Sequence, residues 1–99
     1  MAQEGSRAWG SGLSVEVVSR HGGTVFAGEA ERVSVPLING ELGVLPGRQP
    51  LVAVLGSGPV RLSPVDGEMR RVEVSGGFCS VDHDVITIAA DHVKQDAEA

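Results

Sequence analysis

The sequence predicts an all-β fold, an antiparallel β-sandwich of about eight to ten short strands. Apolar and polar residues alternate in short runs, and turn-forming residues separate these runs at spacings near ten residues. No apolar pattern of helical spacing and useful length precedes Ala89. The 99 residues make one domain, in which we predict a flexible extension at 1–12, the sandwich at 13–91 and a short tail at 92–99.

The first predicted strands lie in the N-terminal third. "LSVEV" at 13–17 alternates with period two, as a half-buried strand does, and "RHGG" at 20–23 is a turn in which either glycine can adopt a positive φ. "TVFAGEAERVSVP" at 24–36 predicts a short strand, a break at Gly28 and a second strand. That strand ends at Pro36, because proline cannot donate to a sheet ladder.

Residues 39–51, "NGELGVLPGRQPL", are predicted to form a loop, since they contain three glycines and two prolines. After this loop, "PLVAVL" at 50–55 predicts a strand with a more continuous apolar run. "GSGP" at 56–59 is a predicted turn, and "VRLS" at 60–63 is a further alternating strand.

The last third predicts a hairpin and two strands. "PVDGE" at 64–68 contains the Asp-Gly pair that is typical of tight primed turns. "MRRVEVSGGFCSV" at 69–81 alternates on both sides of a Gly-Gly pair, where a strand would bend or bulge at a sandwich corner. "DHD" at 82–84 is a turn, and "VITIAA" at 85–90 is the last predicted strand.

Charge and hydropathy exclude two classes of direct partner. The net charge is −5, and the basic residues are scattered except for Arg70 and Arg71, so no basic stripe would neutralise nucleic-acid phosphates. The longest apolar run, at 51–55, is far shorter than the roughly 18 residues that span a bilayer. Because residues 1–12 also lack the apolar core of a signal peptide, we expect a soluble protein that reaches a membrane only through a partner.

Residues able to support catalysis or metal binding are few. Cys79 follows Phe78 in an apolar run, where a small buried thiol is expected rather than a nucleophile. The Gly-x-Gly segments neither open a helix nor precede a phosphate-loop lysine. The histidines lack the spacing of zinc ligands, and they are His21, His83 and His92. We therefore expect no catalytic residue, metal, cofactor or nucleotide.

Three motifs follow one another along the chain. They are "GELGVLPG" at 40–47 with "PL" at 50–51, then "VSGGF" at 74–78, and then "VITIAAD" at 85–91. In this order and at these separations they resemble the epsilon subunit of the F-type ATP synthase, called delta in mitochondria. "LSVEVVS" and "VFAGEAERVSVP" are similar to the opening strands of that family, so the resemblance covers about residues 13–91.

The resemblance implies a rotor subunit of the central stalk, which couples the gamma subunit to the c-ring of a proton-translocating ATP synthase and does no chemistry. A carboxylate on a proline-stiffened loop is ordered before it docks on basic c-ring loops, although such an acid can also be merely solvated. The implied c-ring contacts are Glu41, Leu42 and Arg48. The implied gamma contacts are Ser75, Gly76 and Gly77, whose glycines also suit a sandwich corner.

Members of this family usually continue into a helical hairpin that inhibits ATP hydrolysis and in some members binds ATP. Since this sequence stops at Ala99, we expect it to dock and couple without that arm and without ATP. The implied location is peripheral, at the cytoplasmic face of the bacterial plasma membrane. The alternative is a free-standing β-sandwich that binds a small ligand or another protein. A stalk subunit should expose an apolar patch that matches gamma, whereas a ligand binder should show a concave pocket.

Overall fold

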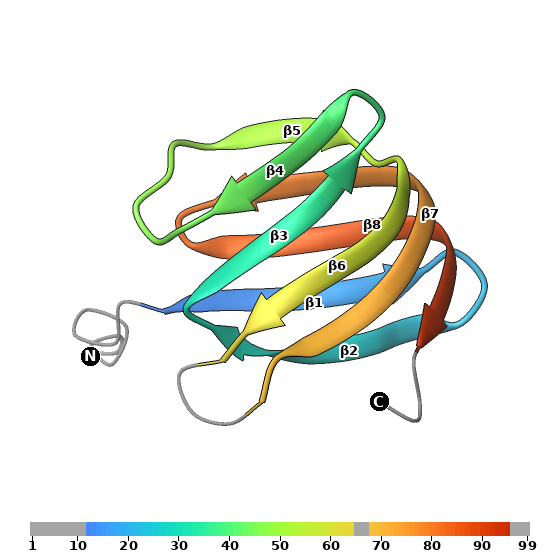
Figure 1. The fold of residues 1–99 in the computed structure, drawn as a ribbon, viewed down its shortest axis with the longest axis horizontal. Helices are drawn as coiled ribbons and strands as arrows, with labels where there is room; N and C mark the ends of the chain where they lie inside the picture. Colours follow the sequence, from blue (N-terminus) through green and yellow to red (C-terminus); the bar gives the residue numbers. More distant parts are fainter. Residues whose placement is uncertain (1–11, 65–67, 96–99) are drawn as a thin grey trace.

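The computed structural model describes residues 12–64 and 68–95, and the regular structure in these ranges consists of β-strands (Figure 1). The predicted extension at 1–12 and the predicted Asp-Gly turn lie almost wholly outside the described residues. The strands are β1 Leu13–Ser19, β2 Gly23–Ala30, β3 Arg32–Leu37, β4 Gly40–Val44, β5 Leu51–Val54, β6 Ser57–Ser63, β7 Arg70–Asp82 and β8 Val85–Gln95.

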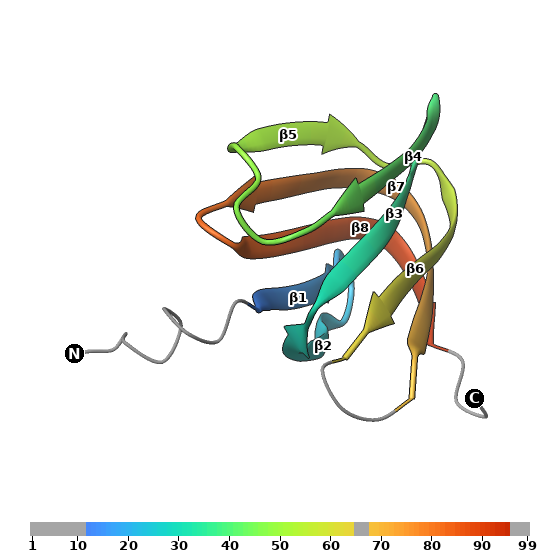
Figure 2. The ribbon, with the colours of Figure 1, turned by 60° about the vertical axis from the view of Figure 1, so that its left-hand side comes forward.

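The strands pack as two layers that share β7 and β8 (Figure 2). Hydrogen bonding follows the order β2-β1-β8-β7-β6-β3-β4, and β5 pairs β7 beside this path. The first half of β7 pairs β6, whereas its second half pairs β5. One layer therefore contains β2, β1 and β5, and the other contains β6, β3 and β4. The predicted β-sandwich is confirmed.

One strand pair departs from the predicted antiparallel arrangement. Strands β1 and β8 run parallel, from Ser14 opposite Val85 to Ser19 opposite Ala90. A parallel pair needs a long connection, and here most of the domain separates the two strands in sequence. Period-two alternation carries no information about this direction, so the sequence pattern did not predict it.

Several strand boundaries also differ from those predicted. The predicted loop at 39–51 contains β4, which pairs β3 antiparallel. Strand β2 continues through Gly28, and the break falls at Glu31. Strand β6 begins at Ser57, inside the predicted turn. Tertiary pairing in these places outweighs the local preference of glycine for turns.

The last strand is longer than predicted. Strand β8 continues beyond Ala90 to Gln95, so part of the predicted tail at 92–99 belongs to the sheet. Residues Val72 to Ser75 of β7 supply the partners for this extension, as Val74 opposite Val93 shows. The sequence 92–95 has no clear strand pattern of its own, and the neighbouring strand decides its conformation.

The core is aliphatic and receives alternate residues from both layers. No polar or charged side chain is buried among the described residues. Each fully buried Val, Leu or Ile contributes about 1.5–3 kcal/mol relative to an exposed one. The largest fully buried side chains are Leu13, Leu55, Leu62, Ile86, Ile88, Val17, Val33, Val35, Val44, Val60, Val72 and Val81.

Strand β7 changes layer at a corner formed by Gly76 and Gly77. These residues have φ values of 75° and 107°, which side chains rarely permit. A Cβ on Gly76 would lie 2.8 Å from Asp91 Oδ2, and a Cβ on Gly77 would overlap the carbonyl oxygen of Ala89. The bend predicted at the Gly-Gly pair is confirmed, and steric exclusion requires glycine there.

The connection from β5 to β6 crosses between the layers at the same corner. A Cβ on Gly56 would lie 2.6 Å from the carbonyl oxygen of Leu37. The Gly56 carbonyl accepts a hydrogen bond of 3.1 Å from the N–H of Gly76, and the N–H of Leu55 donates to the carbonyl of Gly77 at 2.9 Å. Glycines that are distant in sequence thus build one corner.

Candidate docking surfaces

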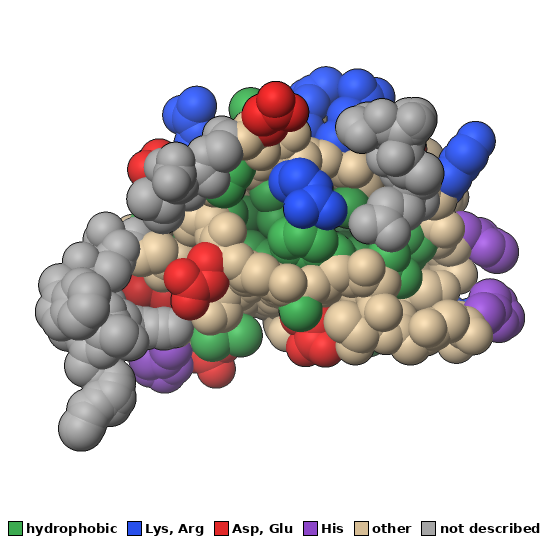
Figure 3. All heavy atoms as spheres, turned by 90° about the horizontal axis from the view of Figure 1, so that it is seen from below, with side chains coloured by type: hydrophobic (Ala, Val, Ile, Leu, Met, Phe, Trp, Pro, Cys, Tyr) green, Lys and Arg blue, Asp and Glu red, His purple; other side chains and the backbone are tan. Residues whose placement is uncertain are grey.

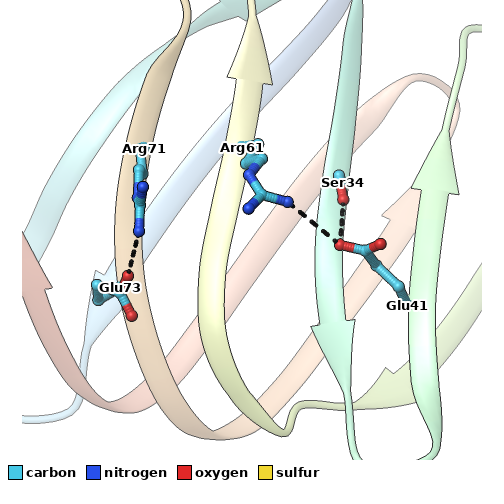
Figure 4. Close-up of polar contacts among 5 residues, drawn as sticks. All are labelled: Ser34, Glu41, Arg61, Arg71 and Glu73. Carbon is cyan, nitrogen blue, oxygen red and sulfur yellow. Dashed lines mark hydrogen bonds and ion pairs between the residues drawn. The ribbon is translucent and has the colours of Figure 1, made fainter.

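Glu41 belongs to a charged network on the outer face of β4, β3 and β6 (Figure 4). Its carboxylate accepts a hydrogen bond of 2.8 Å from the Ser34 hydroxyl, and Arg61 Nη1 lies 3.7 Å from the same oxygen. On the adjoining part of β7, Arg71 pairs with Glu73 at 3.1 Å. We call these five residues the charged face. Exposed ion pairs of this kind contribute at most about 1 kcal/mol each.

The three predicted c-ring residues do not form one patch. Glu41 was predicted to lie on a loop stiffened by prolines, but it lies within strand β4. Its side chain is oriented by Ser34 and Arg61 instead. Leu42 is half-buried and packs against the core, because strand side chains alternate between faces. Arg48 is exposed in the connection 45–50, beyond the other end of β4.

The connection 45–50 is attached to the turn between β7 and β8. The N–H of Gly47, whose φ is 88°, donates a hydrogen bond of 2.8 Å to Asp84 Oδ1. The carbonyl oxygen of Asp84 accepts another of 2.9 Å from the N–H of Ser14. Asp84 therefore joins the turn to the connection that carries Arg48 and to the start of β1. From the sequence, Asp84 was predicted only to be part of a turn at 82–84.

The predicted gamma-contact residues lie at the sandwich corner. The hydroxyl groups of Ser75 and Ser57 are 3.0 Å apart and share a hydrogen bond. Gly77 lines a groove of about 390 Å³ together with Phe78, Ala89 and Val18. The corner itself explains both glycines, and the groove places the backbone of Gly77 next to exposed Phe78 and half-buried Val18 and Ala89.

An exposed apolar patch lies on the outer face of β5 and the second half of β7. Val52 is 73% exposed, Val54 55% and Phe78 53%. Val54 is directly opposite Phe78, and Val52 is opposite Ser80. We call Val52, Val54 and Phe78 the apolar patch. These residues were not predicted as a site, although the more continuous apolar run of "PLVAVL" indicates that both sides of β5 are apolar.

A hollow at the edge of the sandwich is formed by β2, β6 and β7. It has a volume of about 390 Å³, and Phe26, Leu62 and Pro64 are among its lining residues. Figure 3 shows the molecule from below, with a central hydrophobic area that a basic side chain partly covers and with charged side chains of both signs around it. The Arg70 guanidinium lies 5.1 Å from the centroid of the Phe26 ring, a cation–π contact. The Phe26 ring thus packs against the core at this edge, and the Arg70 guanidinium lies over the ring.

The described residues contain no group of three or more His, Cys, Asp or Glu side chains placed to hold a metal ion. Cys79 is buried, as predicted, and desolvation raises the pKa of its thiol from 9.0 to about 11. The thiol is therefore neutral near pH 7 and behaves as an apolar core side chain. No described segment forms a helix with the length and hydropathy needed to cross a membrane.

Comparison with known sequences finds one family and its members. The family described as "ATP synthase, Delta/Epsilon chain, beta-sandwich domain" matches residues 12–96. The ATP synthase epsilon chain of Micrococcus luteus is 46% identical over 78 residues, which cover 79% of this chain and 85% of that one. The ATP synthase epsilon chain of Bordetella petrii is 40% identical over 79 residues, which cover 80% of this chain but 55% of that one.

Solved structures share the fold at low sequence identity. A chain of the Euglena gracilis mitochondrial ATP synthase, in a structure of its OSCP, F1 and c-ring, matches with a TM-score of 0.79 and 20% identity. That match covers 90% of this chain and 56% of the other. A chain of the Tetrahymena thermophila central stalk and c-ring matches with a TM-score of 0.68 and 13% identity, covering 87% and 68%. With the sandwich and the family match over residues 12–96, this chain belongs to the β-sandwich domain family of the ATP synthase delta and epsilon chains.

Proposed function

We propose that this chain is a non-catalytic rotor subunit that couples the gamma subunit to the c-ring of a proton-translocating ATP synthase. Its bacterial relatives are ATP synthase epsilon chains, which supports membership of the same complex. The observation that carries the proposal is the apolar patch, since a stalk subunit needs a surface that can be desolvated against a neighbour.

The apolar patch is the proposed gamma contact. Val54 and Phe78 form a cross-strand pair, so their side chains present one continuous apolar surface. Aromatic and aliphatic side chains in a desolvated centre usually supply most of the binding free energy at an interface. Ser75, Gly76 and Gly77 lie at the border of this surface, where glycine backbone permits close approach.

Glu41 and Arg48 are the proposed c-ring contacts. Ser34 and Arg61 hold the Glu41 carboxylate in one direction, and this order reduces the entropy lost on docking. A charge at an interface rim mainly steers the partner and sets its register. Leu42 acts indirectly in this proposal, because its packing against the core fixes the strand that carries Glu41.

The proposed location is peripheral, at the cytoplasmic face of the bacterial plasma membrane. The c-ring is the only proposed link to the bilayer, and no cofactor, nucleotide or nucleic acid is part of the proposal. The bacterial origin of the most similar chains described above supports this location.

A binding experiment with purified gamma subunit and detergent-solubilised c-ring tests the proposal. We expect the wild-type chain to be retained on both. Glu41→Lys should weaken only retention on the c-ring, and the matched control Glu29→Lys, an exposed site on β2, should change neither. Absence of wild-type retention on both partners would contradict the proposed function.

A further inference from the structure

The turn between β7 and β8 places two non-glycine residues in a backbone conformation that favours glycine. His83 has a φ of 51° and Asp84 a φ of 65°, and Asp82 pairs Val85 directly across the turn. Two-residue hairpin turns of this kind prefer asparagine or glycine at these positions. Aspartate and histidine are among the few non-glycine residues that tolerate positive φ, so the turn permits Asp84 but does not by itself require its carboxylate.

The side chain of Asp84 supplies an explanation. Its carboxylate accepts the N–H of Gly47 at 2.8 Å across 37 positions of sequence. Within the described part of the chain, no other hydrogen bond joins residues 45–50 to another segment. Pro46 and Pro50 provide no N–H donor in this connection. A hydrogen bond to a charged acceptor is also stronger than one between neutral groups.

We infer that Asp84 is a positioning residue, whose carboxylate holds the connection 45–50, and with it Arg48, in the conformation that docks on the c-ring. The inference rests on the proposed function. Arg48 directly follows Gly47, so the anchored N–H is adjacent in sequence to the proposed contact. An anchored connection loses less conformational entropy on binding than a free one, which is the physical source of the effect.

Three substitutions distinguish positioning from a purely structural role. Asp84→Gly removes the acceptor but relaxes the turn, so stability should be unchanged or higher. Asp84→Asn keeps an acceptor oxygen and a tolerance for positive φ but loses the charge, so Gly47 exchange and c-ring affinity should lie between those of wild type and Asp84→Gly. His83→Gly relaxes the same turn without removing the acceptor of Gly47 and is the matched control.

The measurements are the solvent exchange of the Gly47 amide by NMR, the thermal unfolding midpoint, and affinity for detergent-solubilised c-ring. For Asp84→Gly we expect Gly47 exchange to accelerate about tenfold or more and c-ring affinity to fall about 3- to 10-fold, with no loss of stability. His83→Gly should change neither the exchange nor the affinity.

Equal exchange rates of the Gly47 amide in Asp84→Gly and His83→Gly would show that the Asp84 carboxylate does not hold the connection 45–50. Faster exchange in Asp84→Gly with unchanged c-ring affinity would overturn the role in docking while leaving the anchor. If the wild-type chain itself does not bind the c-ring, the proposed function fails and the docking role fails with it. The Gly47 exchange rates would still decide whether Asp84 holds the connection.

Discussion

The two outer faces of the sandwich expose different chemistry although strand β7 contributes to both. Its first half places Arg71 and Glu73 on the charged face, and its second half places Phe78 in the apolar patch. The buried positions shift between the halves, from Val72 and Val74 to Cys79 and Val81. The corner therefore does more than bend the strand, because it also decides which residues of the alternating pattern face outward.

The positive and negative side chains of the charged face pair with one another, whereas the side chains of the apolar patch are exposed to water without a partner surface. Arg61 lies directly opposite Arg71, and like charges in this arrangement destabilise a sheet. Glu41 offsets one arginine and Glu73 the other. The charged groups of this face are therefore paired with each other and exposed to water. The exposed Val54–Phe78 pair gains free energy only when another surface covers it, whereas the charged face gains little from being desolvated.

The largest expected effect comes from breaking the corner that creates both faces. Gly77→Ala adds a Cβ that overlaps the Ala89 carbonyl oxygen, at a φ of 107°. We expect a loss of about 4 kcal/mol or more in the free energy of unfolding, measured by chemical denaturation. Gly43→Ala on β4 is the control, since a Cβ there meets nothing within 4 Å. Equal stability of the two variants would refute the steric explanation.

The next effect tests whether the apolar patch is the docking face. Phe78→Asp should weaken gamma binding at least about 100-fold, or about 2.8 kcal/mol, because a carboxylate cannot be desolvated cheaply in an apolar contact. The folded state should be retained, since Phe78 is 53% exposed. Met69→Asp, at a similarly exposed apolar side chain outside the patch, should leave the affinity measured by biolayer interferometry unchanged.

Cys79 lies in the core between the two faces, and its raised pKa predicts a loss of stability at alkaline pH. Its folded-state pKa is raised by desolvation, so the folded protein retains a proton that the unfolded chain releases above pH 9. Stability should therefore fall as pH rises from 9.0 to about 11, by at most about 2.7 kcal/mol. Denaturant titrations at several pH values should show this loss in wild type but not in Cys79→Ala. Parallel pH profiles would contradict it.

The smallest effect concerns the charged face. Arg61→Ala removes the ion pair with Glu41, which leaves the carboxylate bound to Ser34 and also removes the repulsion from Arg71. We expect the free energy of unfolding to change by less than about 1 kcal/mol and the change to shrink further at high salt. Thermal melts at two salt concentrations test this. A loss much larger than that would mean the charged face stabilises the fold as strongly as the core does.

Much of the fold could be predicted because it depends on local patterns. Alternation in "LSVEV" and "RRVEV" predicted strands whose valines are buried, and the Gly-Gly pair predicted the corner. The prediction failed where pairing partners outweighed local preference. The glycines of β4 favoured a loop, but β3 supplies a ladder for them. The extension of β8 likewise depends on β7.

The sequence by itself determined the fold class, the aliphatic core, the buried thiol and the family, because alternation, glycine placement and motif order are properties of the chain as written. Only the tertiary structure decided which residues share a surface. Glu41 meets Arg61, Val54 meets Phe78, and Asp84 meets Gly47, each across a long stretch of sequence. The physical reason is that strand register and the corner set these neighbours, and both depend on contacts between distant segments.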